Sequence, residues 1–141
     1  MAKLHFDGLN AVEMRMARLA GKLDAAVEDT LKAGAEKHVD ARKGEIRRRG
    51  FVDSGAMLKG VKARMQEDSR NGNKSMVIYS AGKDKHGVRN AEKEYLLHYG
   101  VKGGRSGQRI PSSHWVDEAE RKGQQEAAEA MEKAWEFATK E

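Results

Sequence analysis

The stretch FVDSGAMLKGV, from Phe51 to Val61, decides the fold because the hydrophobic pattern changes its period here. Before it, apolar residues recur at steps of three and four, which predicts a helix, and after it they alternate with polar residues, which predicts strands. Asp53, Ser54 and Gly55 between the two patterns are typical turn residues. We therefore expect this structural turn motif to join a helical half to a β half.

The sequence before the junction predicts a helical region over residues 8–49. One apolar stripe runs along it, formed by Leu9, Val12, Met16, Leu19, Leu23, Ala26, Val27 and Leu31. Glycine within a helix costs about 1 kcal/mol relative to alanine. Because of Gly34 and Gly44, we expect two helical segments rather than one rod.

Three arginines, Arg47, Arg48 and Arg49, end this helical region immediately before Gly50. Cations favour the negative end of the helix dipole, and glycine is the usual residue just beyond a helix. The alternative interpretation is a phosphate-binding patch, which three adjacent basic side chains can also form.

Residues 51–81 predict a strand, a turn and a returning strand. The alternation from Met57 to Gln66 indicates a first strand with one buried face. Asn71 and Gly72 suit the positive φ angles of a tight hairpin turn. Ser75–Ala81 is more apolar than the first strand along its whole length, so we expect the second strand to be central or covered on both faces.

Residues 82–110 are basic and rich in glycine, which predicts mobile loops. Within them, residues 91–99 form either a short helix or a strand, and the leading Ala-Glu-Lys-Glu favours a helix ending at Gly100. Ser112 or Ser113 can cap a last helix over residues 112–139. Its narrow stripe, which permits close packing, consists of Trp115, Ala119, Ala127, Ala130, Met131, Ala134 and Ala138. Trp135 and Phe137 fall outside this stripe and are either covered by another element or exposed for a partner.

These elements predict a single α+β domain over residues 1–141. A long N-terminal helix, which we expect to be broken, precedes a small antiparallel sheet built on a β-hairpin, and a long C-terminal helix packs on the sheet. Hydrophobic residues make up 38% of the chain and charged residues 35%, which leaves little material for a large private core. We expect a thin molecule or one that completes its core with a neighbour.

The charge is unevenly distributed along the chain. Residues 51–110 hold 12 Lys and Arg against 6 Asp and Glu, whereas residues 111–141 hold 4 against 8. Such separation favours head-to-tail contact between copies of the chain, and the basic part can alternatively contact phosphates. The candidate contact residues are Arg47, Arg48, Arg49, Lys83, Lys85, Arg89, Lys102, Arg105, Arg109, Glu118, Trp135 and Phe137.

The sequence offers little support for catalysis. Its five histidines show no recognised metal-ligand spacing, and no GxSxG motif surrounds a serine. The glycines of residues 100–109 lack the order of a phosphate-binding loop. His98, His114 and Asp53 lie near predicted element ends and could meet in space. We expect no enzyme activity, no cofactor and no metal ion.

No stretch of the sequence approaches the length of a membrane-spanning helix, and the first residues lack the apolar core of a signal peptide. We therefore expect the protein to be synthesised in the cytoplasm and to make no contact with a membrane. The absence of cysteine excludes disulfides and thiolate ligands.

The junction resembles a motif of the form PxDTGxLxxSI. Asp53, Ser54 and Gly55 stand at its DTG, Met57 at the leucine, and Gly60-Val61 at the Ser-Ile pair. Serine replaces the threonine of the motif, and the proline before the aspartate is missing.

Two further blocks follow in the same order. Tyr95 and Tyr99-Gly100-Val101 resemble a YAxxxExGT block, in which His98 replaces the glutamate and Val101 the threonine, and Pro111 with Trp115 resembles the proline and aromatic that open a last helix. Together with both flanking helices, these blocks resemble the head–tail joining and tail-completion family of long-tailed bacteriophages, also described as minor tail or neck proteins, over residues 9–138.

The resemblance implies a structural virion protein assembled in the host cytoplasm. Similar proteins form rings, commonly hexamers, at the head–tail joint or the end of the tail tube. The implied partners are further copies of the chain, head-completion or connector proteins, tail tube or terminator proteins, and genomic DNA in transient contact. The alternative that composition leaves open is a small basic nucleic-acid-binding protein.

Overall fold

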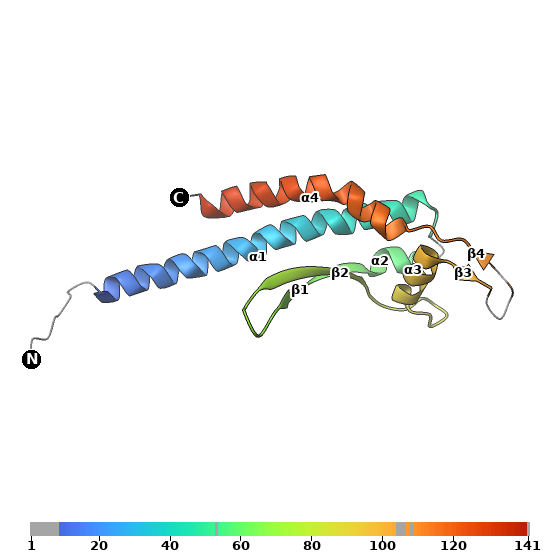
Figure 1. Ribbon diagram of the computed structural model, residues 1–141, viewed down its shortest axis with the longest axis horizontal. Helices are drawn as coiled ribbons and strands as arrows, with labels where there is room; N and C mark the ends of the chain where they lie inside the picture. Colours follow the sequence, from blue (N-terminus) through green and yellow to red (C-terminus); the bar gives the residue numbers. More distant parts are fainter. Residues whose placement is uncertain (1–8, 53, 104–106, 108, 141) are drawn as a thin grey trace, which may run out of the picture.

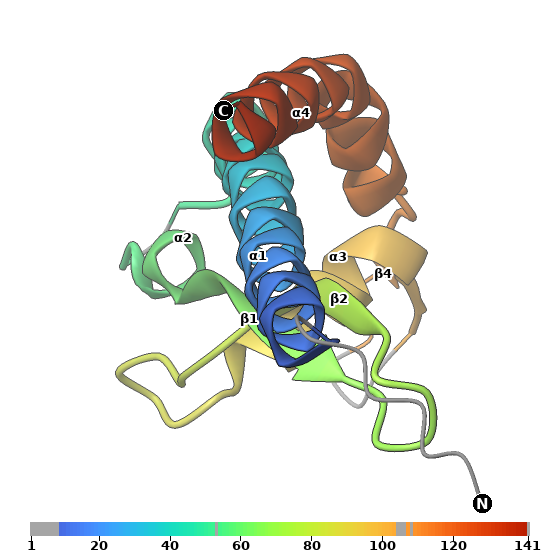
Figure 2. The ribbon, with the colours of Figure 1, turned by 90° about the vertical axis from the view of Figure 1, so that its left-hand side faces the viewer.

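The computed structural model describes residues 9–52, 54–103, 107 and 109–140, and it confirms the predicted α+β class. Helix α1 (Leu9–Arg48) and helix α4 (Trp115–Thr139) lie side by side and antiparallel (Figure 1). A hairpin of β1 (Val61–Glu67) and β2 (Lys74–Ser80) contacts α1 on another side. Seen along its axis, α1 lies between α4 and the hairpin (Figure 2).

Helix α1 is continuous over 40 residues, so the predicted break into two segments is wrong. Gly34 is buried against α4, where an added Cβ would lie 2.6 Å from Sδ of Met131. Tertiary packing at this close approach offsets the intrinsic cost of the glycine. The sequence prediction considered only that intrinsic cost. A Cβ added at Gly44 would meet no atom within 4 Å, and the helix continues through this glycine without a break.

Small residues bring α1 and α4 together. The predicted alanine stripe of α4 is confirmed at its first half, where Ala119 and Ala127 are buried. Gly123 is also buried, and a Cβ there would lie only 2.9 Å from Cβ of Ala41 on α1. The contact with α1 therefore depends on a glycine that the stripe prediction did not include.

The basic end of α1 has the backbone geometry that the sequence predicts. Gly50 has a φ of 70°. The N–H of Phe51 donates to the carbonyl of Ile46 (3.0 Å), and the N–H of Gly50 donates to the carbonyl of Arg47 (3.1 Å). This pair of bonds is a Schellman motif, which satisfies the last carbonyls of a helix. It turns the chain so that Phe51 packs beside Ile46 in the core.

The junction forms a short helix before the strand begins, which corrects the predicted strand from Met57. Gly55, with a φ of 80°, precedes helix α2 (Ala56–Gly60), and β1 starts only at Val61. The main core cluster is built here and consists of Ile46, Met57, Val61 and Trp115. The core therefore gathers the end of α1, the junction and the start of α4.

The predicted β-hairpin is confirmed, with antiparallel pairs from Val61↔Ser80 to Glu67↔Lys74. Its turn is longer than predicted, because only Gly72 has a positive φ and six residues separate the strands. The sheet has two strands, so β2 is not central, which corrects one of the two expectations from its apolar sequence. Residues 76–80 of this strand are all half-buried. Lys74 ties the hairpin to α1 through Asp24 (2.7 Å) and Glu28 (2.8 Å).

Residues 91–99 are helical, as favoured, within α3 (Asn90–Tyr99), which is followed by the short paired strands β3 (Val101–Lys102) and β4 (Arg109–Ile110). The predicted serine cap of the last helix is wrong. The hydroxyl of Ser113 donates to the carbonyl of Leu97 (2.6 Å), and α4 begins later, after His114 in a left-handed conformation. Ser113 thus fastens the connection to α3 instead of capping α4.

Candidate functional site

The first half of α1 carries an exposed apolar surface. Val12, Met16, Leu19 and Leu23, here called the α1 stripe, are all exposed, Met16 to 66%. Their spacing of four, three and four residues places them on one face of the helix. A stripe of this kind normally faces a protein core, and here it faces solvent.

The α1 stripe is exposed because α4 is shorter than α1. The helices run antiparallel, with Gly34 against Met131 and Glu45 paired with Lys122, and α4 ends at Thr139. The first turns of α1 therefore extend beyond the end of α4 (Figure 1). The sequence identified the stripe but not its exposure. The available signal was the unequal predicted length of the two helices.

Trp135 and Phe137, which the sequence left as covered or exposed, lie near the end of α4 and are exposed to 40% and 84%. Glu132, Trp135, Glu136 and Thr139 occupy positions i, i+3, i+4 and i+7, so they share one face of the helix. Phe137 points from a different side, because it is two residues beyond Trp135. The end of α4 therefore presents a tryptophan flanked by glutamates.

The candidate contact residues Arg48 and Arg49 are engaged within the protein. The buried carboxylate of Glu45 accepts hydrogen bonds from Arg48 Nε (2.9 Å), Arg49 Nε (3.0 Å) and Lys122 Nζ. Hydrogen bonds from Arg48, supported by those of Lys122 and Arg49, outweigh burial and hold the pKa of Glu45 well below its usual range. Lys122 links this cluster to α4, whereas Arg48 and Arg49 pair with Glu45 at their own end of α1. Arg47 and Arg48 are exposed.

The loop between β2 and α3 presents Lys83, Lys85 and Arg89 to solvent. It is more ordered than its composition predicts, because the carboxylate of Asp84 accepts the backbone N–H groups of His86 and Val88, both at 2.9 Å. The ion pair with Lys93, followed by these bonds, lowers the pKa of Asp84 to about 2.

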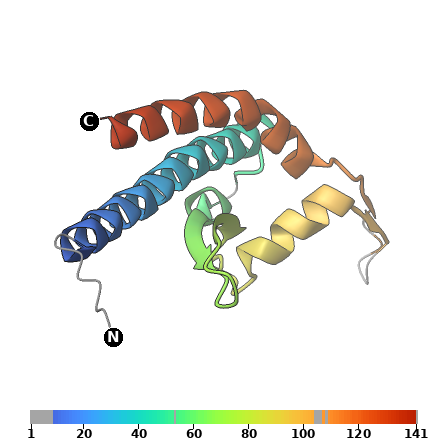
Figure 3. The same ribbon diagram turned by 60° about the vertical axis from the view of Figure 1, so that its left-hand side comes forward.

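Lys102 and Arg109 are exposed and face each other across β3 and β4, while Arg105 lies outside the described residues. Figure 3 shows α3 running from the 82–89 loop at one end to β3 and β4 at the other. Ten helical residues span about 15 Å. The described cations that the sequence singled out are therefore spread over separate sites and do not form one patch.

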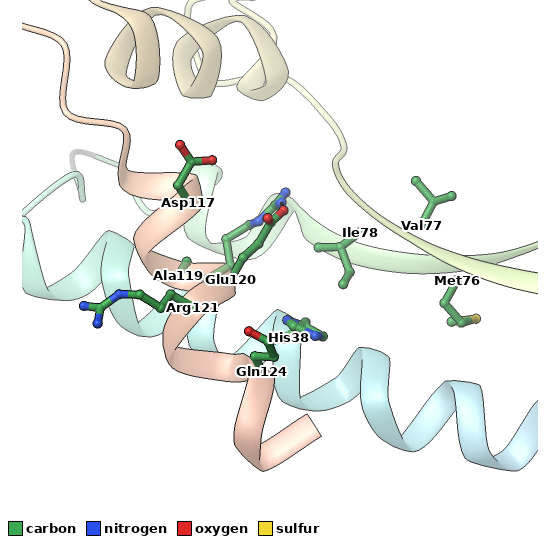
Figure 4. Close-up of a pocket in the computed structure, with 10 residues that line it drawn as sticks. His38, Met76, Val77, Ile78, Asp117, Ala119, Glu120, Arg121 and Gln124 are labelled. Atoms are coloured by element: carbon green, nitrogen blue, oxygen red, sulfur yellow. Dashed lines mark ion pairs between the residues drawn. The ribbon is translucent and has the colours of Figure 1, made fainter. Parts of the chain in front are cut away.

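A cavity of about 760 Å³ lies between α1, β2 and the start of α4. Ile78 extends from the sheet toward the helices that carry His38 and Glu120 (Figure 4). Arg42 forms one wall and lies 4.0 Å from both Glu94 and Glu120. Burial raises the pKa of Glu94. The lining therefore combines ion-paired side chains with an apolar wall from β2. Among the described residues that line it, there is no serine or cysteine that could act as a nucleophile.

His98 and His114 do meet in space, with ring centroids 4.9 Å apart, and Asp117 joins them where Asp53, outside the described residues, was expected. Their potential ligand atoms lie within 4.8 Å of one another. The Nδ1 of His98 accepts the N–H of Val116 (3.3 Å), so a neutral His98 carries its hydrogen on Nε2, which faces Asp117. This arrangement suits a contact between α3 and α4 better than a metal ion.

Of the turn motif, Asp53 lies outside the described residues. The hydroxyl of Ser54 accepts the N–H of Ala56 (3.4 Å), and Gly55 supplies the positive φ. Glu118, in the first turn of α4, pairs with Arg121 of the same helix. These contacts are local.

Comparison with protein-family models, with curated proteins and with solved structures finds no match to this chain. In the part of the chain that the structure describes, no helix combines the length and apolar character needed to cross a membrane.

Proposed function

We propose that this chain is a structural assembly subunit that forms a homo-oligomeric ring at the head–tail joint or tail end of a tailed bacteriophage, and that it is not an enzyme. The exposed α1 stripe is the observation that supports this proposal most directly. The phage context rests on the sequence blocks around Asp53–Gly55, Tyr95–Val101 and Pro111–Trp115.

The α1 stripe exposes apolar surface that a partner can bury. Burial of apolar surface stabilises by about 25 cal/mol per Å². Four large side chains in a row on a projecting helix leave this stabilisation unused in a monomer, and contiguous apolar patches of this kind mark interaction sites. The main core cluster is small and lies at the opposite end of α1, which agrees with a subunit that gains stability from its neighbours.

The proposed ring is hexameric and belongs to the virion, after assembly in the host cytoplasm. Tyr95 and Tyr99 on α3 are exposed and lie with ring centroids 4.7 Å apart. This aromatic pair provides a second surface, distant from the α1 stripe, for neighbouring neck or tail proteins. The exposed lysines and arginines of the loops provide transient contact with DNA in the channel.

Sedimentation velocity across a range of protein concentrations tests the proposal. We expect the full chain to form a defined oligomer and Leu19→Glu to remain monomeric. Met14→Glu is the matched control, because Met14 and Leu19 are both exposed to 57% but Met14 lies off the stripe. A wild-type chain that stays monomeric at every concentration, and that never enters phage particles, contradicts the proposed function.

The second candidate is a small nucleic-acid-binding protein, favoured by the exposed pair Lys102 and Arg109. Binding to phosphates predicts a DNA affinity that falls steeply with salt concentration. The dispersal of the other cations around α3 makes this the weaker candidate. Absence of DNA binding at moderate salt excludes it, without affecting the ring proposal.

A further inference from the structure

Two exposed surfaces of opposite charge lie near the same end of the molecule. The α1 stripe is accompanied by Arg15, Arg18 and Lys22, against a single acid, Glu13, within residues 12–23. The last part of α4, residues 126–139, holds four glutamates and one lysine. Each surface has exposed apolar side chains at its centre, the α1 stripe in one case and Trp135 in the other.

The α1 stripe continues an interface that already exists within the protein. Along α1, the steps of three and four residues that link Val12 to Leu23 lead on to Ala26, which is buried. Further along, Gly34 and Ala41 contact α4 directly. The same side of α1 is therefore covered by α4 in its second half and left uncovered in its first, so a further helix like α4 fits the uncovered part.

Charge decides between the helices that a second copy can offer. Pairing two α1 stripes would bring Arg15, Arg18 and Lys22 against the same cations of the other copy, which is unfavourable. The outer face of α4 instead presents Glu132 and Glu136 on either side of Trp135. An acidic helix with an exposed tryptophan complements a basic helix with an exposed apolar stripe.

We propose that the α1 stripe of one copy packs on the Glu132, Trp135 and Glu136 face of α4 in a second copy. This inference rests on the proposed function, since it names the two surfaces that join neighbouring subunits. In the proposed ring, each copy makes these two contacts with two different neighbours, so the contact is heterologous, and it closes into a ring when the rotation between successive copies closes. Each subunit then contributes its α1 stripe to one neighbour and its α4 face to the other.

Charge reversal tests the pairing. Arg15→Glu with Lys22→Glu, and separately Glu132→Arg with Glu136→Arg, place like charges across the proposed interface. We expect either double variant to weaken assembly by at least about tenfold in dissociation constant at low salt. The chain that carries all four substitutions restores opposite charges and should assemble again. All positions are exposed, and circular dichroism confirms that each variant is folded.

The double variants separate the alternatives. If α1 stripes paired with each other, the reversal on α1 would exchange one like-charge pairing for another, and Glu132→Arg with Glu136→Arg would leave assembly unchanged. An unchanged dissociation constant for this second double variant therefore overturns the inference. Wild-type assembly that is insensitive to both reversals also overturns it, while leaving the proposed ring intact. A wild-type chain that does not assemble removes the proposed function and this inference together.

Discussion

Glu45 is the residue whose replacement tests the packing of the two long helices most directly. Its side chain is only 2% exposed, and its carboxylate accepts bonds from Arg48, Arg49 and, across the helix pair, Lys122. The variant Glu45→Gln keeps the size of the side chain and removes its charge. It therefore weakens the charge-assisted bonds without leaving a cavity.

The expected magnitude follows from these bonds and from the exposure of their donors. A hydrogen bond to a charged group contributes about 1.5–3 kcal/mol. The contributions do not add fully, because the side chains of Arg48 and Lys122 are 56% and 43% exposed and regain water when the carboxylate is lost. We expect the free energy of unfolding to fall by about 2 kcal/mol, which lowers Tm by roughly 6 °C for a chain of this length.

The assay is urea denaturation of both proteins at pH 7 and pH 3. The folded-state pKa of Glu45 is depressed, so its contribution is present above the unfolded-state pKa of about 4.3 and is lost as the pH falls toward the folded-state value. The difference between wild type and variant should therefore shrink at pH 3. Glu118→Gln, which removes a more exposed pair with Arg121, is the control and should leave the midpoint unchanged.

Two outcomes would refute this reasoning. One is an unchanged free energy of unfolding for Glu45→Gln at pH 7, which would mean that the buried carboxylate contributes no net stability. The other is a difference that grows between pH 7 and pH 3, since the sign of the pKa shift requires the reverse.

Three further predictions concern the core. Gly123→Ala should destabilise the folded protein by about 1–2 kcal/mol in thermal melts, because the added Cβ collides with α1. Gly44→Ala adds its Cβ in open space and should stabilise the protein by about 0.5–1 kcal/mol. Equal effects of the two variants would contradict the close approach at Gly123. Trp115→Ala should cost about 3–5 kcal/mol in denaturant titrations, and a loss below about 1 kcal/mol would contradict its place in the core. Burial raises the pKa of Glu94, so wild type should lose stability relative to Glu94→Gln as the pH rises from the unfolded-state pKa of about 4.3 through the raised folded-state pKa. A relative gain of the variant as the pH falls would exclude this sign.

Local patterns predicted most of the secondary structure. The end of α1 at Gly50, the hairpin and the helix before Gly100 follow from backbone preferences that a few neighbouring residues set. Predictions failed where distant contacts decide. Gly34 stays helical because Met131 packs on it, and Ser113 does not cap α4 because it bonds to Leu97.

The candidate site shows the same division. The sequence listed Arg48 and Arg49 as contacts for a partner, but the structure shows both bound to Glu45, because their direction depends on where the helix end meets α4. The α1 stripe was visible as a periodic pattern. Its exposure was not, because periodicity shows that residues share a face and does not show what covers that face.

By itself, the sequence determined the change of period at Phe51–Val61, the α+β class and the separation of basic and acidic segments. The tertiary structure alone decided that this junction holds the core, with Met57 and Val61 against Ile46 and Trp115, and that the far end of α1 stays bare. The physical reason is that burial is a property of pairs of surfaces. A chain specifies an apolar face locally, but only the lengths and directions of the packed helices determine whether another part of the same chain covers it.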